Sequence, residues 1–272
     1  MARGYRFGVV GNLSIVPDGS TVLPTDDIQI WLKCASIKGK TYTTLAQVLA
    51  DSTTLQALIT SPNAVDYVVR STTWASGVTA DSGAMTLIGA NNYASNTLLG
   101  NSTWLNAICN STYFESVLNA KVPTMTSNTT PSGVASSSTY YNQRQAYKGF
   151  DGNTAYPNYW ATSSGKGWVQ YQFTTSNVLK CVKLLQQVSG TSGWTMEDSS
   201  VKVQGSNDGT NFTDIEEITL LSSEATSWKT TSINNSTAYT YIRLDFNAPN
   251  MSVSGARYSV VGEAQFYGRV DV

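Results

Sequence analysis

The chain has 272 residues and a net charge of −1, and only 13% of its residues are charged. This is about half the share of roughly 25% that is typical of soluble domains, so the surface is polar, nearly uncharged and without a basic field to attract nucleic acid. Histidine is absent, which excludes Ser-His-Asp and Cys-His catalysis within this chain and removes the commonest transition-metal ligand.

The first predicted segment, residues 1–35, is an extended arm. Short apolar or alternating runs, such as residues 28–32, are separated by turn residues at positions 17–19 and 24. This is too little to fold alone, so we expect the arm to pair with another element. The N-terminal stretch lacks the continuous apolar run of a secretion signal, and no stretch approaches 18 apolar residues. We therefore expect neither a signal peptide nor membrane insertion.

Residues 36–122 carry an internal repeat of seven units, spaced nine to eleven residues apart. Each unit starts with a polar residue, and apolar residues follow at the spacing of one helical face. Because Ser and Asn accept a hydrogen bond from a free N–H at a helix start, each unit predicts a capped helix of about two turns. Helices so far below roughly 12–15 residues must stack on one another or on a partner chain. The predicted caps are Ser52, Ser61, Ser71, Ser82, Asn92, Ser102 and Ser111.

A change of composition marks a domain boundary after residue 122. Residues 123–138 are nearly all Pro, Ser, Thr, Asn and Gly, without periodicity. From about Tyr140, alternating runs recur with turns about every ten residues, which predicts an all-β sandwich or barrel. The clearest turn is Asp208-Gly209, where glycine accepts the positive φ that a hairpin turn requires. The second domain therefore spans residues 123–272.

Six motifs in this domain resemble the discoidin family, also called F5/8 type C, and its carbohydrate-binding relatives. The resemblance covers roughly the last 150 residues, a typical length for one domain. It implies a β-sandwich that binds sugars, lipids or proteins through loops at one end and is not catalytic. The motifs are YKGFDGN from Tyr147, YW from Tyr159, WVQYQF from Trp168, VQGSNDGTNFTDI from Val203, YIRL from Tyr241 and GEAQFYG from Gly262. The predicted fold class is thus α+β, with an extended arm, an array of short helices and an antiparallel, discoidin-like jelly roll.

The capped repeats resemble segments of tail and other virion proteins from gut bacteriophages. In those proteins a sugar-binding module often follows a junction like KVPTMTSNTTPSG, which begins here at Lys121. The resemblance implies a non-enzymatic structural protein of the virion, anchored through residues 1–122 to other virion proteins and to copies of itself, with a trimer favoured. Its sandwich would adhere to host surface glycan. The alternatives are a secreted bacterial lectin or adhesin module and a purely structural decoration protein.

A sugar site needs an aromatic platform for the apolar face of a pyranose, with fixed donors and acceptors for its hydroxyls. Tyr140 and Tyr156 lie in polar stretches that suit this role, although aromatic residues are more often partly buried. Trp160 and Trp168 match core positions of the family, so we expect both to be buried. The residues predicted to bind carbohydrate are Tyr141, Arg144, Trp194, Asn250, Arg257 and Tyr258.

The resemblance also implies a structural Ca²⁺ site. Asp151-Gly152 matches a turn that in the family often helps to hold calcium beside a glutamate near the last strand, here Glu263. Calcium takes six to eight oxygen ligands. The alternative is an Asx-turn, in which the Asp151 carboxylate accepts from its own backbone.

Cysteine and paired glutamate side chains could also carry chemistry. The three cysteines, at positions 34, 109 and 181, are far apart and odd in number, which predicts buried free thiols. Glu216 and Glu217 are adjacent, and in a strand their side chains point to opposite faces, so they cannot flank one glycosidic bond together. We therefore expect no enzyme activity.

Overall fold

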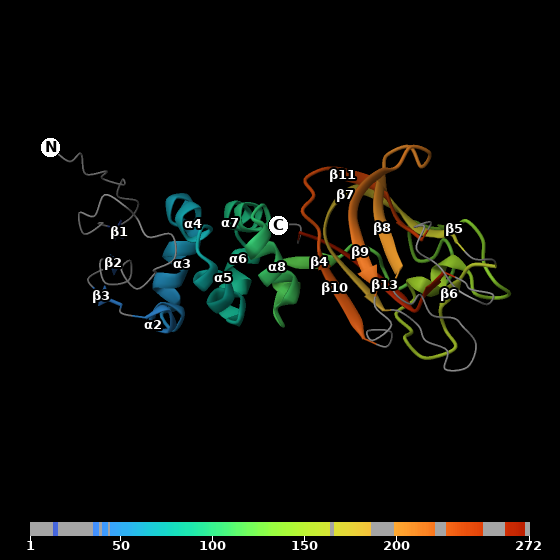
Figure 1. Cartoon of the computed structure of the whole chain (residues 1–272). Helices are drawn as coiled ribbons and strands as arrows, with labels where there is room; N and C mark the ends of the chain where they lie inside the picture. Colours follow the sequence, from blue (N-terminus) through green and yellow to red (C-terminus); the bar gives the residue numbers. More distant parts are fainter. Residues whose placement is uncertain are drawn as a thin grey trace. The chain divides into compact units, whose positions relative to one another are not determined.

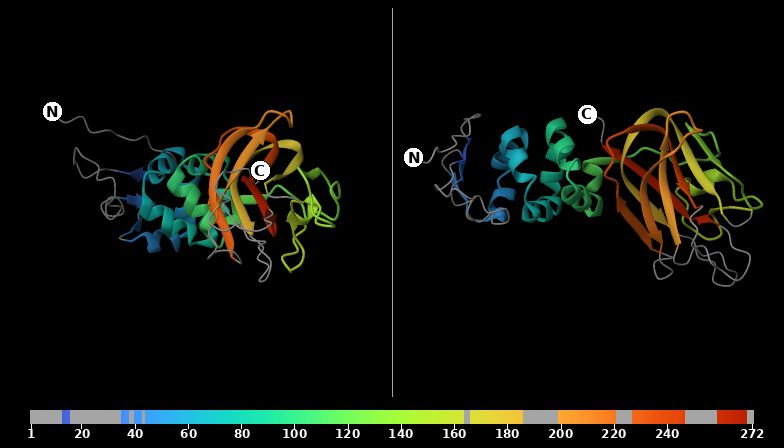
Figure 2. Two further views of the ribbon diagram at one scale, coloured as in Figure 1. Left: turned by 45° about the vertical axis from the view of Figure 1, so that its right-hand side comes forward. Right: turned by 45° about the horizontal axis from the view of Figure 1, so that its top comes forward.

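The structure is a computed structural model of the whole chain. It describes residues 13–15, 35–37, 40–42, 44–163, 166–185, 199–220, 227–246 and 259–269. The chain divides into two compact units, Met1–Leu118 with Arg269–Val272, and Asn119–Gly268. Figures 1 and 2 show short helices in the first unit and a curled β-sheet in the second. The predicted fold class is confirmed, whereas the boundary after residue 122 remains a prediction about what folds independently.

Seven short α-helices follow one another in the described part of the first unit (Figure 1). They are α2 (Leu45–Leu49), α3 (Ser52–Thr60), α4 (Pro62–Val68), α5 (Thr72–Thr79), α6 (Ser82–Gly89), α7 (Asn92–Leu99) and α8 (Ser102–Asn110). The 3-10 helix η1 (Phe114–Ser116) follows them. Strands β1 (Leu13–Ile15), β2 (Ala35–Ile37) and β3 (Lys40–Thr41) precede them and pair in that order. None of the described helices combines the length and apolarity needed to cross a bilayer.

The helices from α3 to α8 repeat every ten residues. In each repeat the fourth and fifth residues are buried, and so are the eighth and ninth, except that Val68 and Val69 of the second repeat are only half-buried. Helices α2 and α8 both pack on α5, α3 packs on α6, and α4 packs on α7. Each helix therefore stacks on the helix three places before it in the sequence, so three helices form one turn of a small solenoid. The stacking supplies the burial that no helix of two turns achieves alone.

The helix caps differ from the prediction by one residue at four positions. Asp51, Asp81, Asn91 and Asn101 are the true N-caps, and each accepts a hydrogen bond from a backbone N–H of the first turn. The predicted residues Ser52, Ser82, Asn92 and Ser102 are instead the first helical residues. Both residues of each pair, such as Asp51 and Ser52, are good N-caps. Which of them precedes the helix depends on which positions of the repeat must be buried.

The remaining predicted caps have three different outcomes. Ser71 caps α5 through a hydrogen bond from the N–H of Trp74, as predicted. Ser61 stands at the cap of α4 without a side-chain bond. Ser111 does not start a helix, because it ends α8 and donates its hydroxyl hydrogen to the carbonyl of Thr79.

Gly89 lies where a neighbouring backbone comes too close to leave room for a side chain. A Cβ atom on Gly89 would lie 1.7 Å from the carbonyl oxygen of Ser116, far inside contact distance. The equivalent ninth positions of other repeats carry larger side chains, such as Ile59 and Leu99. Gly89 therefore lets η1 pack directly against α6.

The second unit is a β-sandwich organised by one long strand, β7 (Trp168–Leu185). The first half of β7 pairs with β5 (Val134–Ser137) and β11 (Ala238–Asp245), and its second half pairs with β10 (Trp228–Ser232) and β13 (Glu263–Arg269). From β11 the sheet continues through β8 (Ser199–Ser206) to β9 (Thr213–Leu220), and β13 leads to β4 (Leu118–Ala120). The registers of β7 with its four partners are antiparallel. By bending from one sheet into the other, β7 brings two inner faces around one core.

Strand alternation decides which aromatic residues enter that core. Trp160, in β6 (Trp160–Ala161), is fully buried as predicted, and Val169 and Tyr171 of β7 point inward with it. The prediction for Trp168 is wrong. This residue alternates with Val169, so it lies on the outer face of the sheet, where its ring lies 4.1 Å from the guanidinium carbon of Arg243.

The cysteine prediction holds where the structure describes it. Cys109 and Cys181 are buried free thiols, and Cys34 lies outside the described residues. Strand β6 pairs with β12 (Val260–Val261) and lies beside two loops that carry exposed tyrosine residues. The 3-10 helix η2 (Ala146–Gly149) separates those loops along the chain.

Candidate functional site

Two loops next to β6 present exposed tyrosine rings. Tyr140 and Tyr141 follow β5, Tyr156 precedes β6, and their exposed fractions are 51%, 39% and 58%. The backbone N–H of Tyr141 donates to the carbonyl of Ala161 in β6 (2.8 Å), and the ring of Tyr156 lies 6.1 Å from that of Tyr159. Both loops therefore lie beside the same short strand, and the Tyr156 ring lies next to that of Tyr159.

The centre of this group is a stack of Arg144 on Tyr159. The guanidinium carbon of Arg144 lies 3.6 Å from the ring centroid of Tyr159, which is itself buried. One terminal nitrogen of Arg144 donates to the carbonyl oxygen of Pro157, next to Tyr156. Burial raises the pKa of Tyr159 above its ordinary value, and the positive charge of Arg144 opposes that increase. Arg144 was predicted as a donor for ligand, and the structure shows that part of its capacity holds the loop.

Hydrogen bonds with Trp160 and Ser163 hold the first loop, which carries Tyr140 and Tyr141. The indole N–H of Trp160 donates to the carbonyl of Thr139 (3.2 Å), and the Thr139 hydroxyl accepts from the N–H of Ser163 (3.2 Å). The N–H of Arg144 donates to the carbonyl of Tyr141 (3.0 Å) and closes a turn. Tyr140 and Tyr141 are thus held by bonds on both sides.

The second loop is built around Asp151. The Asp151 carboxylate accepts from the N–H of Asn153 (2.9 Å), which is the Asx-turn that the sequence left as the alternative to calcium. Gly152 has φ = +70° at this turn, a left-handed conformation that glycine adopts without strain. The side-chain amide of Asn158 donates to both carboxylate oxygens of Asp151 (2.8 and 3.0 Å).

Glu263 approaches this turn from β13, as the family resemblance implied. It is 3% exposed, and one of its carboxylate oxygens accepts from the N–H of Gly152 (3.1 Å). Loss of hydration on burial raises its pKa to about 8, the negative charge of Asp151 adds to this increase, and the backbone N–H groups oppose it. At neutral pH the Glu263 carboxyl is therefore mainly protonated.

The arrangement of Asp151 and Glu263 does not fit a metal ion. Calcium requires a shell of oxygen lone pairs, but the Asp151 oxygens already accept N–H groups of Asn153 and Asn158. Within the ranges that the structure describes, no three His, Cys, Asp or Glu side chains gather in a group able to hold a metal ion.

The structure describes only part of the predicted site. It brings Tyr141 and Arg144 together, whereas Trp194, Asn250, Arg257 and Tyr258 lie outside the described residues. Sequence reasoning missed Tyr159 and Asn158 as members of the site. Their only signal was their place at the end of the polar run that leads into the YW motif.

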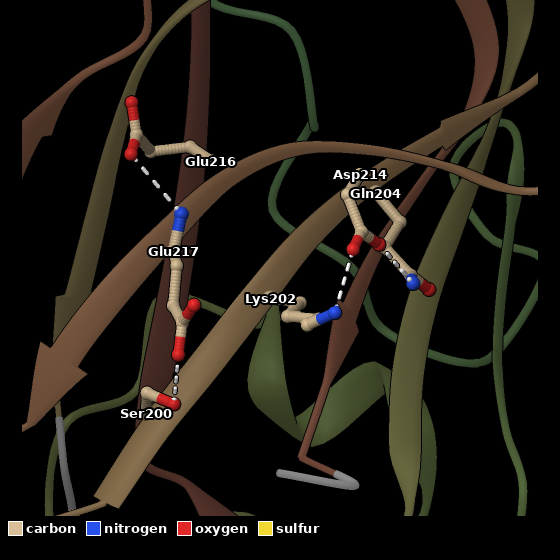
Figure 3. A network of polar contacts seen from close by, with 6 residues as sticks. All are labelled: Ser200, Lys202, Gln204, Asp214, Glu216 and Glu217. Carbon is tan, nitrogen blue, oxygen red and sulfur yellow. Dashed lines mark hydrogen bonds and ion pairs between the residues drawn. The ribbon is translucent and has the colours of Figure 1, made fainter.

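The acidic residues of β9 belong to a separate network on β8 and β9, drawn in Figure 3. The Asp214 carboxylate accepts from Lys202 (2.6 Å) and Gln204 (2.7 Å), and the bond from Lys202 is the main reason that the pKa of Asp214 is lowered. The carboxylates of Glu216 and Glu217 point apart, and the second accepts from Ser200 (Figure 3). These exposed contacts join two neighbouring strands and resemble a surface network of small energetic weight.

Comparison with known families finds a match in the second unit. Residues 132–260 match the family model described as the F5/8 type C domain. This match supports an F5/8 type C domain over these residues. A comparison with curated proteins finds no match. The match begins just before β5 and ends in β12, so the F5/8 type C domain contains both tyrosine-bearing loops.

Three similar solved structures come from bacteria. CpGH89CBM32-5 of Clostridium perfringens, in complex with GalNAc-β-1,3-galactose, is 17% identical, with a TM-score of 0.39, covering 49% of this chain and 94% of that chain. The family 32 CBM of C. perfringens NanJ, in complex with galactose, is 18% identical, with a TM-score of 0.40, covering 50% and 93%. A fucose binding module of Streptococcus pneumoniae is 14% identical, with a TM-score of 0.39, covering 49% and 89%.

Proposed function

We propose that the F5/8 type C domain binds glycan through the two loops that carry Tyr140, Tyr141 and Tyr156. The observation that carries this proposal is the exposure of three tyrosine rings on the two loops that the stack of Arg144 on Tyr159 joins. A phenol ring offers an apolar face to the C–H groups of a sugar and a hydroxyl to its polar edge. Large aromatic residues gathered at a surface mark an interaction site more often than scattered ones do.

The anchoring of the loops supports this function. Tyr141 is bonded to β6, and Pro157 is held by Arg144, so the backbone beside two of the rings is fixed before a ligand arrives. Such preorganisation reduces the entropy that a ligand must offset on binding. A shallow site with few charges still implies modest affinity for each copy. Several copies displayed together raise the avidity by about 10² to 10⁴ when they can engage at once.

The helical unit suggests where such a module works. We propose a non-enzymatic bacteriophage virion protein in which residues 1–122 contact other virion proteins and copies of this chain, with a trimer favoured. The resemblance of the repeats to virion segments supports this placement, and glycan binding then serves adhesion to the host surface. A secreted bacterial lectin or adhesin is equally consistent with the F5/8 type C domain. Antibody against the chain should label purified virions under the first proposal and particle-free culture fluid under the second.

A glycan array with a multivalent display of the full chain tests the binding function. We expect Tyr141→Ala and Tyr156→Ala each to reduce binding at least tenfold without lowering the melting temperature, because both side chains are exposed. Tyr113→Ala is the matched control, since Tyr113 is exposed to the same 39% as Tyr141 but lies in the helical unit. If the site variants bind like the control, these loops are not the glycan site. If the unaltered chain binds nothing, a purely structural decoration protein is the better reading.

A further inference from the structure

The amide nitrogen of Asn158 lies among three oxygen atoms of the loop that carries Tyr156. It is 2.8 and 3.0 Å from the two carboxylate oxygens of Asp151 and 2.9 Å from the carbonyl oxygen of Asn153. These distances are those of N–H···O hydrogen bonds. One side chain thus supplies positive N–H groups to acceptors that are otherwise suited to a cation.

The orientation of this amide is decided by Lys148. Its ammonium group donates to the side-chain oxygen of Asn158 (2.9 Å), and a lysine can only donate. The oxygen of the amide must therefore face Lys148, and the NH₂ group must face Asp151 and Asn153. The reverse orientation would place an oxygen against three acceptors and leave the lysine without this bond.

Asn158 also closes the loop through its backbone. Its N–H donates to the carbonyl of Ala155 (2.8 Å), so Tyr156 and Pro157 lie inside a turn. The bond from Arg144 to the Pro157 carbonyl holds the same turn from the other loop. Tyr156 is exposed between these two attachments.

We propose that Asn158 takes the place of a bound metal ion in this F5/8 type C domain and positions the Tyr156 loop without calcium. The part of this inference that concerns ligand binding rests on the proposed glycan site, and the part that concerns the metal does not. The oxygen atoms of Asp151 and Asn153 that could bind calcium already accept hydrogen bonds from the Asn158 amide. Asn158 acts through the loop and is a positioning residue.

Asn158→Asp in the full chain tests the inference most sharply. It exchanges the NH₂ group for an oxygen and adds a carboxylate beside Asp151, so the turn should now need a cation. We expect the melting temperature of the unaltered chain to be the same in chelator and in millimolar Ca²⁺. The Asn158→Asp variant should melt at least about 3 °C lower in chelator and recover when Ca²⁺ is added. Asn177→Asp is the control, because the side-chain amide of Asn177 donates to the carbonyl of Thr175 in the same strand, away from Asp151.

Two results would overturn the proposal. One is a lower melting temperature of the unaltered chain in chelator, which would show that a metal ion holds the turn. The other is an Asn158→Asp variant that is as stable in chelator as the unaltered chain, which would show that the amide is not needed. Asn158→Ala supplies the functional readout, with glycan binding expected to fall at least threefold. If no form of the chain binds glycan, the proposed function fails, while the melting temperatures still decide the role of Asn158.

Discussion

The buried carboxyl of Glu263 predicts a pH dependence of stability that one substitution should remove. Its pKa is raised from 4.5 to about 8 in the folded chain, so the folded state keeps a proton that the unfolded state releases. Below about pH 4.5 Glu263 is protonated in both the folded and the unfolded state, and the stability that its retained proton contributes is fully present. Between 4.5 and 8 stability must fall as the pH rises, and above 8 both states are ionised.

The size of this effect follows from the difference between the two pKa values. A change of one in pKa is worth about 1.4 kcal/mol, so the span from 4.5 to 8 corresponds to about 5 kcal/mol as an upper bound. Glu263→Gln keeps the shape and remains neutral at every pH. This substitution should therefore remove most of the loss of stability between pH 5 and pH 8.

Urea unfolding of the full chain at pH 5, 6, 7 and 8 measures the free energy of unfolding for each variant. We expect the variant and the unaltered chain to differ little at pH 5, and the variant to be more stable by a few kcal/mol at pH 8. Glu217→Gln is the control, since that carboxylate is exposed in β9 and should leave the pH profile unchanged. A pH profile of Glu263→Gln that parallels the unaltered chain would refute the assignment of this slope to Glu263.

The remaining predictions concern the helical unit and the separation of the two units. Gly89→Ala should lower the free energy of unfolding by about 3 kcal/mol in urea unfolding, because its Cβ would overlap the Ser116 carbonyl. Gly83→Ala in the same helix should cost far less, because its Cβ would lie 3.3 Å from a side-chain oxygen of Asp81, which can move, and not against backbone. Ser71→Ala should cost about 1 kcal/mol in the same assay by removing the cap bond to Trp74. Residues 118–272, which keep β4 and the bond from Lys121 to Phe266, should be monomeric by light scattering while the full chain oligomerises. An oligomeric fragment would move the assembly role out of the helical unit.

Much of the fold was predictable because it rests on local periodicity. Apolar residues at helical spacing after a polar pair predict short helices, and alternation with turns predicts the sandwich. The cap position was less predictable, because Asp51-Ser52 and Asn101-Ser102 each offer two adjacent acceptors. Which of the two residues caps the helix depends on which positions the stacked helices bury.

The site was harder to predict because its members meet only through the fold. Glu263 and Gly152 are 111 positions apart and form one bond, and the stack of Arg144 on Tyr159 joins two different loops. The prediction of Trp168 as core failed because adjacent strand residues face opposite sides. The sequence pattern of β7 did not say which side was inside.

Local sequence patterns were enough to specify the two-part organisation, the ten-residue repeat of the helices and the loops that carry the site. These features depend on residue types at short spacing, which set local hydrogen bonding and burial before any long-range contact forms. Tertiary structure alone decided that Asn158 would face the acceptors of Asp151 and Asn153, and that Glu263 would lose its hydration beside them. The reason is physical: the pKa and the hydrogen-bond partners of a side chain depend on which distant groups exclude water from it.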